Sequence, residues 1–490
     1  MTGKVILTSV LSAMLGVAML SAGALSPKWA LGFLGLFGVV CVGVLSKDPE
    51  RFFLGLFFVT LPLPIANFVG QLSTLHRGGP PGYFILLSDL PLAMLYCLWI
   101  PKLISGSAEK VRLSFGSWCI FGVIVMSVMS MWNAADIQFC GYELVRLLVL
   151  LLLYLYMANA PAVRRHLDTI LIAAVLGLLA EGVLGIFQVV SGRGIGLRLT
   201  GQGAGLVRFE GFLRAGGTLG HPNTFALYLG LLLPVALSML AANKALIRRT
   251  LFGSAAILGT TALILTLSRG GWTGFLLSLC IWLVLVFRFR LVPTTRLVIA
   301  ISLGLALFLG AFMLFHEPIT TRLLVDDQGS AYSRIPLMKV AFNMIQAHPF
   351  LGVGLNNYLL VMSQYDDTAQ GMAFYFLNVV HNSYLLIASE IGIPGLLCFL
   401  GLPLFALQRA WQFLKMKGDR MLSLLVVGVL AGFGGLFWQM LVENVYLTYH
   451  SILMFWAFAG LMESLVRLPA GYARMRPAFI KAMHAAAVAP

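Results

Sequence analysis

The stretch DTILIAAVLGLLAEGVLGIFQVV, residues 168–190, decides what kind of protein this chain forms. After Asp168 it is apolar almost throughout, and Glu181 is its one ionisable residue. A helix of this length reaches roughly 35 Å, enough to cross the hydrocarbon core of a bilayer. The alternation of apolar and polar residues that marks a membrane β-strand is absent. The stretch therefore predicts a transmembrane helix.

The composition extends this prediction to the whole chain of 490 residues. Hydrophobic residues make up 60% and charged residues 10%, whereas soluble proteins carry about 25% charge. So few ions cannot cover a water-facing surface, which excludes soluble, fibrous and disordered classes. We predict an all-α integral membrane protein with about 14 transmembrane helices. The expected spans are 5–25, 29–45, 52–69, 83–100, 116–132, 139–158, 168–190, 222–241, 251–267, 272–287, 297–315, 392–408, 421–441 and 449–466.

The distribution of Lys and Arg predicts the orientation in the membrane. The net charge is +15, from 33 Lys and Arg against 18 Asp and Glu. No motif for RNA or DNA accompanies it, so we expect no nucleic-acid partner. Basic residues concentrate in alternate loops when both termini are placed in the cytoplasm. These loops would then face anionic headgroups, which makes membrane lipids expected partners.

This topology divides the chain into six parts and leaves no room for a separate soluble domain. Two long loops face outward, so chemistry is expected there and at the outer ends of the spans. The parts are spans 1–7 at 1–190, a Gly/Arg-rich outer loop at 191–221, spans 8–11 at 222–315, a large outer loop at 316–391, spans 12–14 at 392–466 and a basic cytoplasmic tail at 467–490.

The first long loop ends in a glycine-rich segment, Arg214-Ala-Gly-Gly-Thr-Leu-Gly-His221-Pro222-Asn223. Glycines let backbone N–H groups approach an anion, and a helix N-terminus adds partial positive charge. Arg214 beside this arrangement fits a phosphate clamp, and Arg208 lies earlier in the same loop. The alternative is a flexible loop that ends in a helix cap, since Pro222 suits a first helical turn.

A short outer hairpin, Thr266-Leu-Ser-Arg269-Gly-Gly-Trp272, joins two apolar spans. An arginine in so tight a hairpin either snorkels to the headgroups or points into the bundle. Pointing inward, Arg269 would meet the same cavity as Arg214.

The second long loop contains an amphipathic segment at 331–347. Its apolar residues recur at helical spacing, and Arg334 lies off their stripe. Such a helix is expected to lie along the outer membrane face of the bundle. The stripe consists of Ile335, Met338, Phe342 and Ile345.

The same loop closes with His381-Asn382-Ser-Tyr-Leu, a polar cluster that opens an apolar helical run. His381 can act as a base near neutral pH or donate a hydrogen bond to a phosphate. The alternative is a helix cap or an interfacial polar group. A second outer polar group comprises Glu443, Asn444 and His450.

Polar and sulfur-containing side chains inside the predicted spans are interpreted as structural. Glu143 and Arg146 lie three residues apart on one predicted helix, where they can pair. Six cysteines lie in or beside apolar runs without the spacing of a metal site, and we expect no disulfide among them. The cysteines are Cys41, Cys97, Cys119, Cys140, Cys280 and Cys398.

Motifs for metal or cofactor chemistry are missing from the sequence. It has no nucleotide-binding loop, no HExxH pair, no GxSxG turn and no carboxylate cage. We therefore expect neither a metal nor a cofactor. The acidic pair Asp366-Asp367 is the one alternative metal site.

Four motifs together resemble the O-antigen ligase/polymerase superfamily of bacterial polytopic glycosyltransferases. The resemblance covers about residues 200–400, and the order and spacing of the motifs carry it. The end of the span at Gln188 is similar too, but less specific, and the N-terminal spans are unspecific. The motifs are Arg214 before Gly-Gly-Thr-Leu-Gly-His-Pro-Asn, the Leu-Ser-Arg269-Gly-Gly hairpin, His348-Pro-Phe-Leu-Gly-Val-Gly and His381-Asn-Ser-Tyr-Leu.

The resemblance implies a GT-C-like fold in the bacterial inner membrane with an active site that faces the periplasm. Such enzymes take a glycan from undecaprenyl diphosphate and pass it to an acceptor hydroxyl, without a nucleotide sugar or a metal. The essential residues of the family map onto Arg214, Arg269 and His381, which we expect to be catalytic. Expected further contacts to the pyrophosphate or glycan are Arg334, His221, Asn223, Asn382 and Arg208.

The residues agree with this chemistry. Undecaprenyl diphosphate is an anionic leaving group, and arginines can stabilise the charge that develops on it in place of a metal. His381 could take the proton of the acceptor hydroxyl or bind the pyrophosphate, and the sequence leaves both roles open. One displacement at the anomeric carbon inverts its configuration. We therefore predict a metal-independent, inverting glycosyltransferase in lipopolysaccharide O-antigen or exopolysaccharide assembly.

The acceptor is open between a saccharide and a glycolipid. Ligases that use lipid A-core look like twelve-span proteins, so a count of about 14 slightly favours an O-antigen polymerase. A protein acceptor is a third choice. The alternative from another class is a membrane transporter of an anionic solute or lipid, which many spans and inward cations also fit. That alternative lacks a repeated pair of broken helices.

Overall fold

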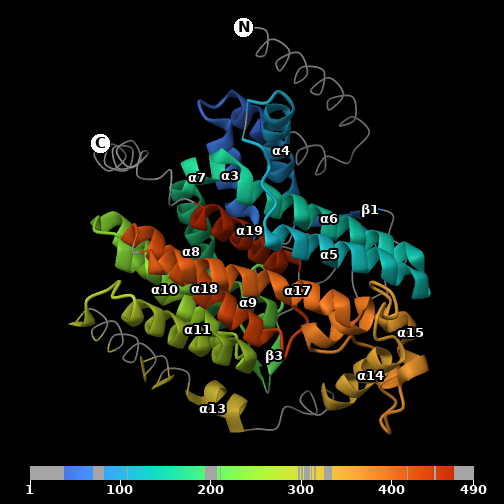
Figure 1. Ribbon diagram of the computed structural model, residues 1–490. Coiled ribbons are helices and arrows are strands. Elements are labelled where there is room, and N and C mark those ends of the chain that lie inside the picture. The colour runs from blue at the N-terminus through green and yellow to red at the C-terminus, as the bar shows by residue number, and fades with distance from the viewer. Residues whose placement is uncertain are drawn as a thin grey trace.

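A computed structural model shows a bundle of long apolar helices (Figure 1). The predicted spans 5–25 and 297–315 lie wholly or largely outside the residues that the structure describes, as does nearly all of the basic tail. The described residues are 38–63, 65–69, 82–107, 109–193, 207–209, 211–295, 298, 302, 309–310, 312–313, 316–324, 334–416, 418–445 and 449–467.

Twelve helices of the described part form the bundle. The C-terminal helices pack on earlier ones: α17 packs on α5, α18 on α9 and α11, and α19 on α6 (Figure 1). The helices are α3 (Pro49–Thr60), α4 (Asp89–Ile104), α5 (Phe115–Ser130), α6 (Ile137–Asn159), α7 (Pro161–Arg165), α8 (Leu167–Ser191), α9 (Pro222–Ala242), α10 (Leu246–Leu265), α11 (Arg269–Arg288), α17 (Ser383–Lys415), α18 (Arg420–Gln439) and α19 (Tyr449–Val466).

Seven helices among the described residues are long and apolar enough to cross a membrane. They confirm an integral membrane protein built on helices, and the full set of 14 spans stays a prediction. The seven are Phe115–Asn133, Ile137–Asn159, Leu167–Ser191, Pro222–Ala242, Arg269–Arg288, Ser383–Lys415 and Arg420–Gln439.

Two of the predicted spans are wrong in extent. The run 52–69 is helical only to Thr60, and the run 83–100 becomes helical only at Asp89. Between them, β1 (Ala66–Val69) and β2 (Tyr83–Leu86) pair as antiparallel strands. Proline explains the first difference, since Pro62 and Pro64 follow the end of α3 and cannot continue a helix.

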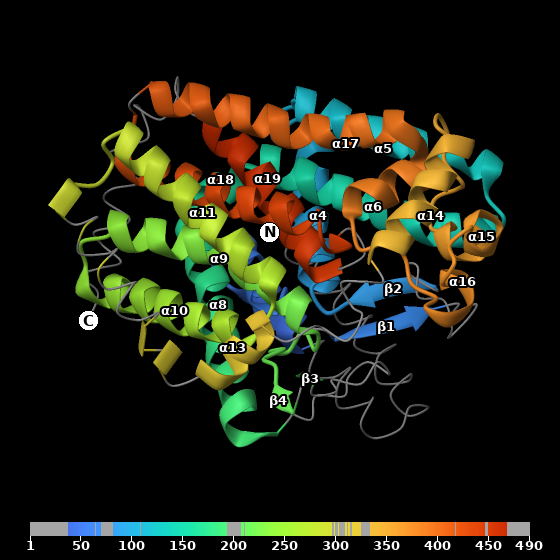
Figure 2. The same cartoon turned by 90° about the horizontal axis from the view of Figure 1, so that it is seen from below.

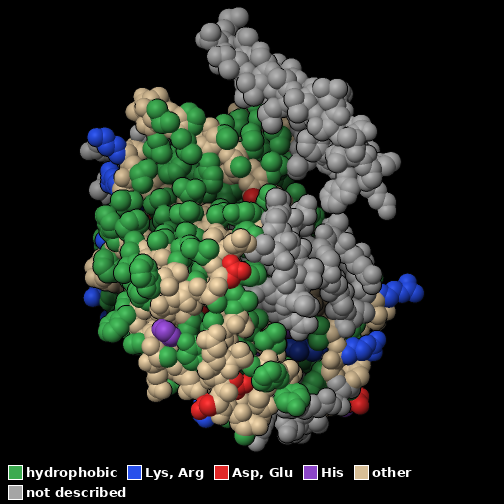
Figure 3. Space-filling view, turned by 90° about the vertical axis from the view of Figure 1, so that its right-hand side faces the viewer, with side chains coloured by type: hydrophobic (Ala, Val, Ile, Leu, Met, Phe, Trp, Pro, Cys, Tyr) green, Lys and Arg blue, Asp and Glu red, His purple; other side chains and the backbone are tan. Residues whose placement is uncertain are grey.

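The outer surface of the bundle is apolar, as contact with lipid requires. Large side chains on the spans stay exposed, among them Trp118, Phe121, Leu152, Phe187 and Leu404. Figure 3 shows hydrophobic side chains over most of the upper half of one face, with few charges among them. A contiguous apolar surface of this kind marks a membrane-facing protein.

Glycines let α18 approach its two neighbours very closely. A Cβ atom at Gly428 would lie 2.9 Å from the Pro234 carbonyl oxygen of α9, and one at Gly432 would lie 2.5 Å from the Leu231 carbonyl oxygen. A Cβ atom at Gly435 would lie 2.6 Å from the Gly274 carbonyl oxygen of α11. Small residues at such spacing are how helices associate where no hydrophobic effect drives them together.

Charged residues divide between the two ends of the bundle. One end holds basic residues from several loops: Lys102 and Arg165 contact Glu50, and Arg248 contacts Asp168. The helices α9, α11, α17 and α19 begin at the opposite end, where α8, α10 and α18 finish. All residues predicted for the site belong to that opposite end.

The large loop 316–391 folds into four short helices and is not an open loop. They are α13 (His316–Leu324), α14 (Arg334–Ala347), α15 (Tyr358–Tyr365) and α16 (Met372–Tyr375). Figure 2 shows α14, α15 and α16 gathered at one end of α17. Their small core includes Leu337, Val340, Met344, Tyr358 and Met362.

The predicted amphipathic helix exists, and most of its predicted apolar stripe faces away from the protein. Ile335, Met338 and Phe342 are exposed by 74%, 41% and 54%. The buried face instead carries Pro336, Leu337, Val340, Ala341 and Met344, which pack on α15 and α17. Both faces of α14 are apolar, so the pattern alone could not say which one meets the protein. The exposed apolar stripe can contact the membrane, and that contact stays a prediction.

The motif His348-Pro-Phe-Leu-Gly-Val-Gly fastens this small helical unit to a break in α17. At Gly392 the backbone leaves helical geometry (φ 78°, ψ 169°). The freed carbonyls of Ser389 and Glu390 accept hydrogen bonds from the Val353 and Gly354 N–H groups, at 2.8 and 3.1 Å. Irregular backbone inside a membrane protein is tolerated when its polar groups are satisfied in this way.

The interior polar groups behave as predicted. Glu143 and Arg146 form a buried ion pair on α6. All six cysteines are free.

Candidate active site

Arg214 is held in place by two neighbouring segments. Its Nε donates to the Thr266 carbonyl oxygen at 2.8 Å, and its Nη2 donates to Asn223 Oδ1 at 3.0 Å. The side chain is 9% exposed. Thr266 is the C-cap of α10 and lies just before the hairpin to α11. The two hydrogen bonds of Arg214 therefore join the first long loop to α9 and to that hairpin.

The glycine-rich turn after Arg214 is locked from inside the bundle. Gln188 Oε1 accepts hydrogen bonds from the N–H groups of Gly216 and Gly217 at 3.1 and 2.9 Å, and its Nε2 donates to the Gly217 carbonyl. Glu181 accepts from the backbone N–H and the hydroxyl of Thr218. The prediction that these N–H groups hold an anion is therefore wrong, because protein partners occupy them. The turn serves to fix the position of Arg214.

His221 and Asn223 form the start of α9. Nδ1 of His221 accepts from the Asn223 N–H at 3.3 Å, which places the proton of the neutral ring on Nε2. Partial burial of the ring lowers the pKa of His221, although its side chain stays open to solvent on one side. The Glu443 carboxylate opposes this shift, and Arg214 reinforces it. Both charges therefore lie close to the imidazole.

Glu443 is the centre on which the predicted residues converge. Its Oε1 accepts from Asn223 Nδ2 at 2.5 Å and lies 3.5 Å from Arg334 Nη2. Its Oε2 lies 3.6 Å from His381 Nδ1. Asn223, Arg334, His381 and Glu443 come from four segments distant in sequence, and Glu443 is 8% exposed. A carboxylate so nearly buried is stable only beside cations and hydrogen-bond donors.

The segment that carries Glu443 is anchored to the start of α17. The Ser383 hydroxyl donates to the Glu443 carbonyl at 2.8 Å, and Asn382 Nδ2 donates to the Leu441 carbonyl at 3.0 Å. Asn382 Oδ1 also caps α17 by accepting from the Leu385 N–H. Asn382 thus places His381 and Glu443 side by side, and its contact with a sugar stays a prediction.

Arg269 is the first residue of α11 and lies beside the same cluster. Its hairpin contains Thr266, which binds Arg214. The next residue, Gly270, lies against Val442, where a Cβ atom would be 3.0 Å from Val442 Cγ2. The residues around Arg269 in sequence thus contact both Arg214 and the segment that carries Glu443, which places Arg269 close to both.

Arg208 lies apart from this cluster. It is exposed in β3 (Arg208–Phe209), which pairs with β4 (Phe212–Leu213), and its Nη1 donates to the Gly211 carbonyl within that hairpin. Its predicted contact with substrate depends on residues of the loop outside the described part.

The acidic pair of the large loop is occupied by protein partners. Burial alone would raise the pKa of Asp366, but hydrogen bonds from Thr368 and Ala373 outweigh it and lower that pKa. Hydrogen bonds from Lys339, at 2.9 Å, and from Asn343 lower the pKa of Asp367. These contacts tie α14 to the α15–α16 connection, which gives both carboxylates a structural role.

Among the described residues one cluster has the geometry of a metal site, and it lies elsewhere. It consists of Asp48, Glu50 and His166 at the basic end of the bundle. Lys102 and Arg165 already neutralise Glu50, and burial lowers the pKa of His166. We interpret the cluster as an ion-pair network.

Two residues of the site were not identified as such from the sequence. Glu443 was noted only as part of an outer polar group, and Gln188 only as a weak point of resemblance. A carboxylate just beyond the end of an apolar span was the available signal for Glu443. Gln188 had none, since its partners are backbone groups of a turn about 30 residues away along the chain.

One family model matches the chain. Residues 254–400 match the model described as O-Antigen ligase, a range that includes Arg269, Arg334 and His381. A search of curated proteins gives no match.

Proposed function

With a domain of the O-antigen ligase family at residues 254–400, we propose that this membrane protein is a metal-independent, inverting glycosyltransferase. Its donor is a glycan linked to undecaprenyl diphosphate, and its acceptor is a sugar hydroxyl at the periplasmic face of the bacterial inner membrane. It serves O-antigen or exopolysaccharide assembly.

The convergence of distant segments on Glu443 supports this proposal most strongly. Among the described residues that converge on Glu443, Arg214, Arg269 and Arg334 bring three positive charges to that one carboxylate. The excess of positive charge suits a diphosphate leaving group, and the planar guanidinium can bind its oxygens in pairs. The Gln188 and Thr266 contacts hold Arg214 rigid, which is what electrostatic stabilisation of a transition state needs.

The proposed reaction is a single displacement. The acceptor oxygen forms a bond to the anomeric carbon as the bond from that carbon to the diphosphate oxygen breaks. His381 takes the proton of the acceptor hydroxyl, and Glu443, 3.6 Å away, stabilises the resulting imidazolium. The leaving diphosphate keeps the electron pair of the broken bond and is stabilised by the arginines.

We expect chelation to leave the activity intact, because arginines carry the positive charge that a metal would supply. Purified protein is incubated with a fluorescent undecaprenyl-diphosphate-linked repeat unit, with and without EDTA, and products are resolved on a gel. The expected result is transfer without ATP at the same rate in both samples. Loss of transfer in EDTA with recovery in manganese or magnesium would contradict metal independence. No transfer under any condition, with uptake into vesicles, would favour a transporter.

The same assay identifies the acceptor. A polymerase lengthens the lipid-linked repeat unit when it is the sole substrate, whereas a ligase requires added lipid A-core. The span count inferred from the sequence favours the polymerase.

The proposed face of the membrane has its own test. The basic residues gather at the end of the bundle opposite the Arg214–Glu443 cluster, and basic loops face the cytoplasm. A reporter fused after Pro490 should therefore be cytoplasmic, and one inserted at Gln328 should be periplasmic. Alkaline phosphatase and green fluorescent protein fusions give the two signals. Both positions on one side would contradict the orientation.

A further inference from the structure

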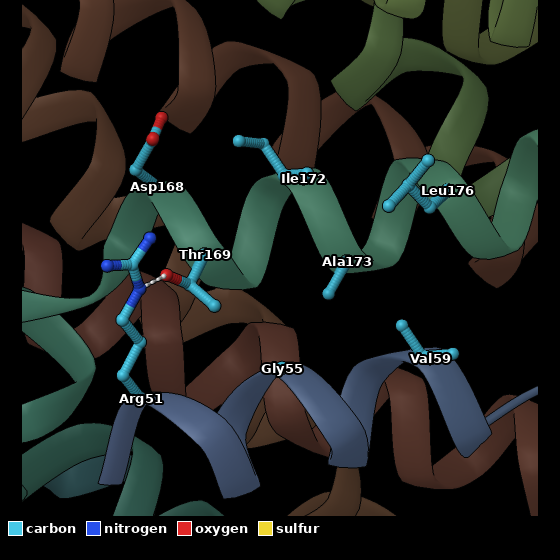
Figure 4. Close-up of a pocket in the computed structure, with 8 residues that line it drawn as sticks. All are labelled: Arg51, Gly55, Val59, Asp168, Thr169, Ile172, Ala173 and Leu176. Atoms are coloured by element: carbon cyan, nitrogen blue, oxygen red, sulfur yellow. Dashed lines mark hydrogen bonds between the residues drawn. The ribbon is translucent and has the colours of Figure 1, made fainter. Parts of the chain in front are cut away.

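A lateral groove of about 220 Å³ lies between α3 and α8 (Figure 4). Its floor is shaped by small residues, Gly55 and Ala173, and its rim by Val59 and Leu176, which are 41% and 43% exposed. The groove is lined by Arg51, Gly55, Val59, Asp168, Thr169, Ile172, Ala173 and Leu176.

The groove is apolar along its length and polar at one end. Figure 4 shows Arg51 and Thr169 meeting at that end, while Val59 faces α8 near Leu176 at the other. Because α8 is long and apolar enough to cross a membrane, we expect the open side of the groove to face lipid. Water cannot fill an apolar groove at that depth, so an acyl chain is the occupant that the surroundings supply.

The charges at the polar end leave one cation in excess. Glu50 is bound by Lys102 at 2.5 Å, and Asp168 is bound by Arg248 through both carboxylate oxygens, at 2.5 and 2.9 Å. Among the described residues, the Arg51 side chain donates only to the Thr169 hydroxyl, through Nε at 3.2 Å. Its two terminal amino groups therefore remain available for an anion at the level of the headgroups.

We propose that this groove binds one anionic phospholipid, with its phosphate on Arg51 and one acyl chain along Gly55, Val59, Ile172 and Leu176. The site is at the basic end of the bundle, so the lipid belongs to the leaflet opposite the proposed active site. The proposal rests on the groove and its charges and does not depend on the reaction.

Native mass spectrometry of the purified protein tests the proposal. The protein is reconstituted in nanodiscs of phosphatidylethanolamine with or without phosphatidylglycerol, released into the gas phase, and its retained lipids are counted. Wild-type protein should retain a phosphatidylglycerol that Arg51→Gln retains about fivefold less well, since one basic residue near the surface contributes about that factor. Val59→Trp keeps the charge but fills the groove, and should displace the same lipid.

The matched control is Arg288→Gln, which removes an exposed cation from the same end of the bundle but outside the groove. It should retain the lipid as wild type does. Equal retention in all four proteins, or equal loss in Arg51→Gln and Arg288→Gln, would overturn the proposal. If Val59→Trp fails to fold, as shown by gel filtration, Arg51→Gln against Arg288→Gln still decides the outcome. If phosphatidylethanolamine takes the same place in wild type and Arg51→Gln, the groove has no anionic preference and the proposal is wrong.

Discussion

His381→Ala should slow glycan transfer by about 10²–10⁴-fold, the range that removal of a general base commonly costs. The side chain is 26% exposed and lies just before the N-cap of α17, so its loss leaves the packed core intact. Its Nδ1 is nearest to Glu443 and has no hydrogen-bond partner among the described residues. The variant should therefore reach the membrane at wild-type levels and fail in chemistry. The measurement is the rate of transfer from the fluorescent lipid-linked donor, normalised to protein on a blot.

Arg269→Lys is the companion variant. Lysine keeps the positive charge but lacks the planar fork that binds two diphosphate oxygens, so we expect a loss of about 10²–10³-fold. Arg193→Ala is the control, because Arg193 is exposed beyond the end of α8 and, among the described residues, only its backbone N–H makes a hydrogen bond. It should remain close to wild type. If His381→Ala and Arg269→Lys are well expressed and still transfer at the wild-type rate, the proposed site is wrong.

Gly352→Ala should unfold the junction between α17 and the α14–α16 unit. The backbone at Gly352 has φ 69°, which costs an alanine about 1–2 kcal/mol. The added Cβ would also overlap the Glu390 carbonyl group, which accepts the hydrogen bond from the Gly354 N–H at the break in α17. We expect a large fall in thermal stability and early protease cleavage in the large loop.

Gly371→Ala separates the two causes of that loss. Gly371 has a similar φ of 60°, but the nearest atom to an added Cβ is 3.8 Å away. This control should lose only the backbone term, about 1–2 kcal/mol. Thermal unfolding of both proteins in detergent, followed by tryptophan fluorescence, gives the comparison. Equal destabilisation would show that contact with Glu390 does not matter.

The apolar runs predicted the membrane class and most helices correctly, because apolar length is a local property. The apolar runs did not predict features that depend on other parts of the sequence or on packing. The run 52–69 is as apolar as its neighbours, and its prolines turn its end into a strand. For α14 the sequence predicted the outward apolar stripe, and only packing against α15 and α17 shows that the other apolar face meets the protein.

The site was predictable in its cations and not in its organisation. Arg214, Arg269 and His381 stand in short motifs, so residue type and local sequence make them candidates, and their roles stay predictions. Glu443 lies about 60 residues beyond His381 and becomes important only because Ser383 and Asn382 bind the end of α18. The sequence of the glycine-rich turn suggested free N–H groups that could bind an anion. Those groups instead donate to Gln188 and Glu181, which lie on α8 about 30 residues earlier in the chain, so the turn's own sequence could not show that they are occupied.

The close contact of α18 with α9 and α11 has a consequence for motion. Backbones separated by no more than a glycine cannot slide or rotate past one another, so the ends of these helices, which carry Asn223, Arg269 and Glu443, form a rigid frame. The bulky lipid-linked donor that we propose must nevertheless enter and leave. The backbone break at Gly392 and the turn that packs on it are the points where dihedral angles can change without breaking a helix. Opening and closing therefore fall to the α14–α16 unit, which would carry Arg334 toward and away from a stationary Glu443.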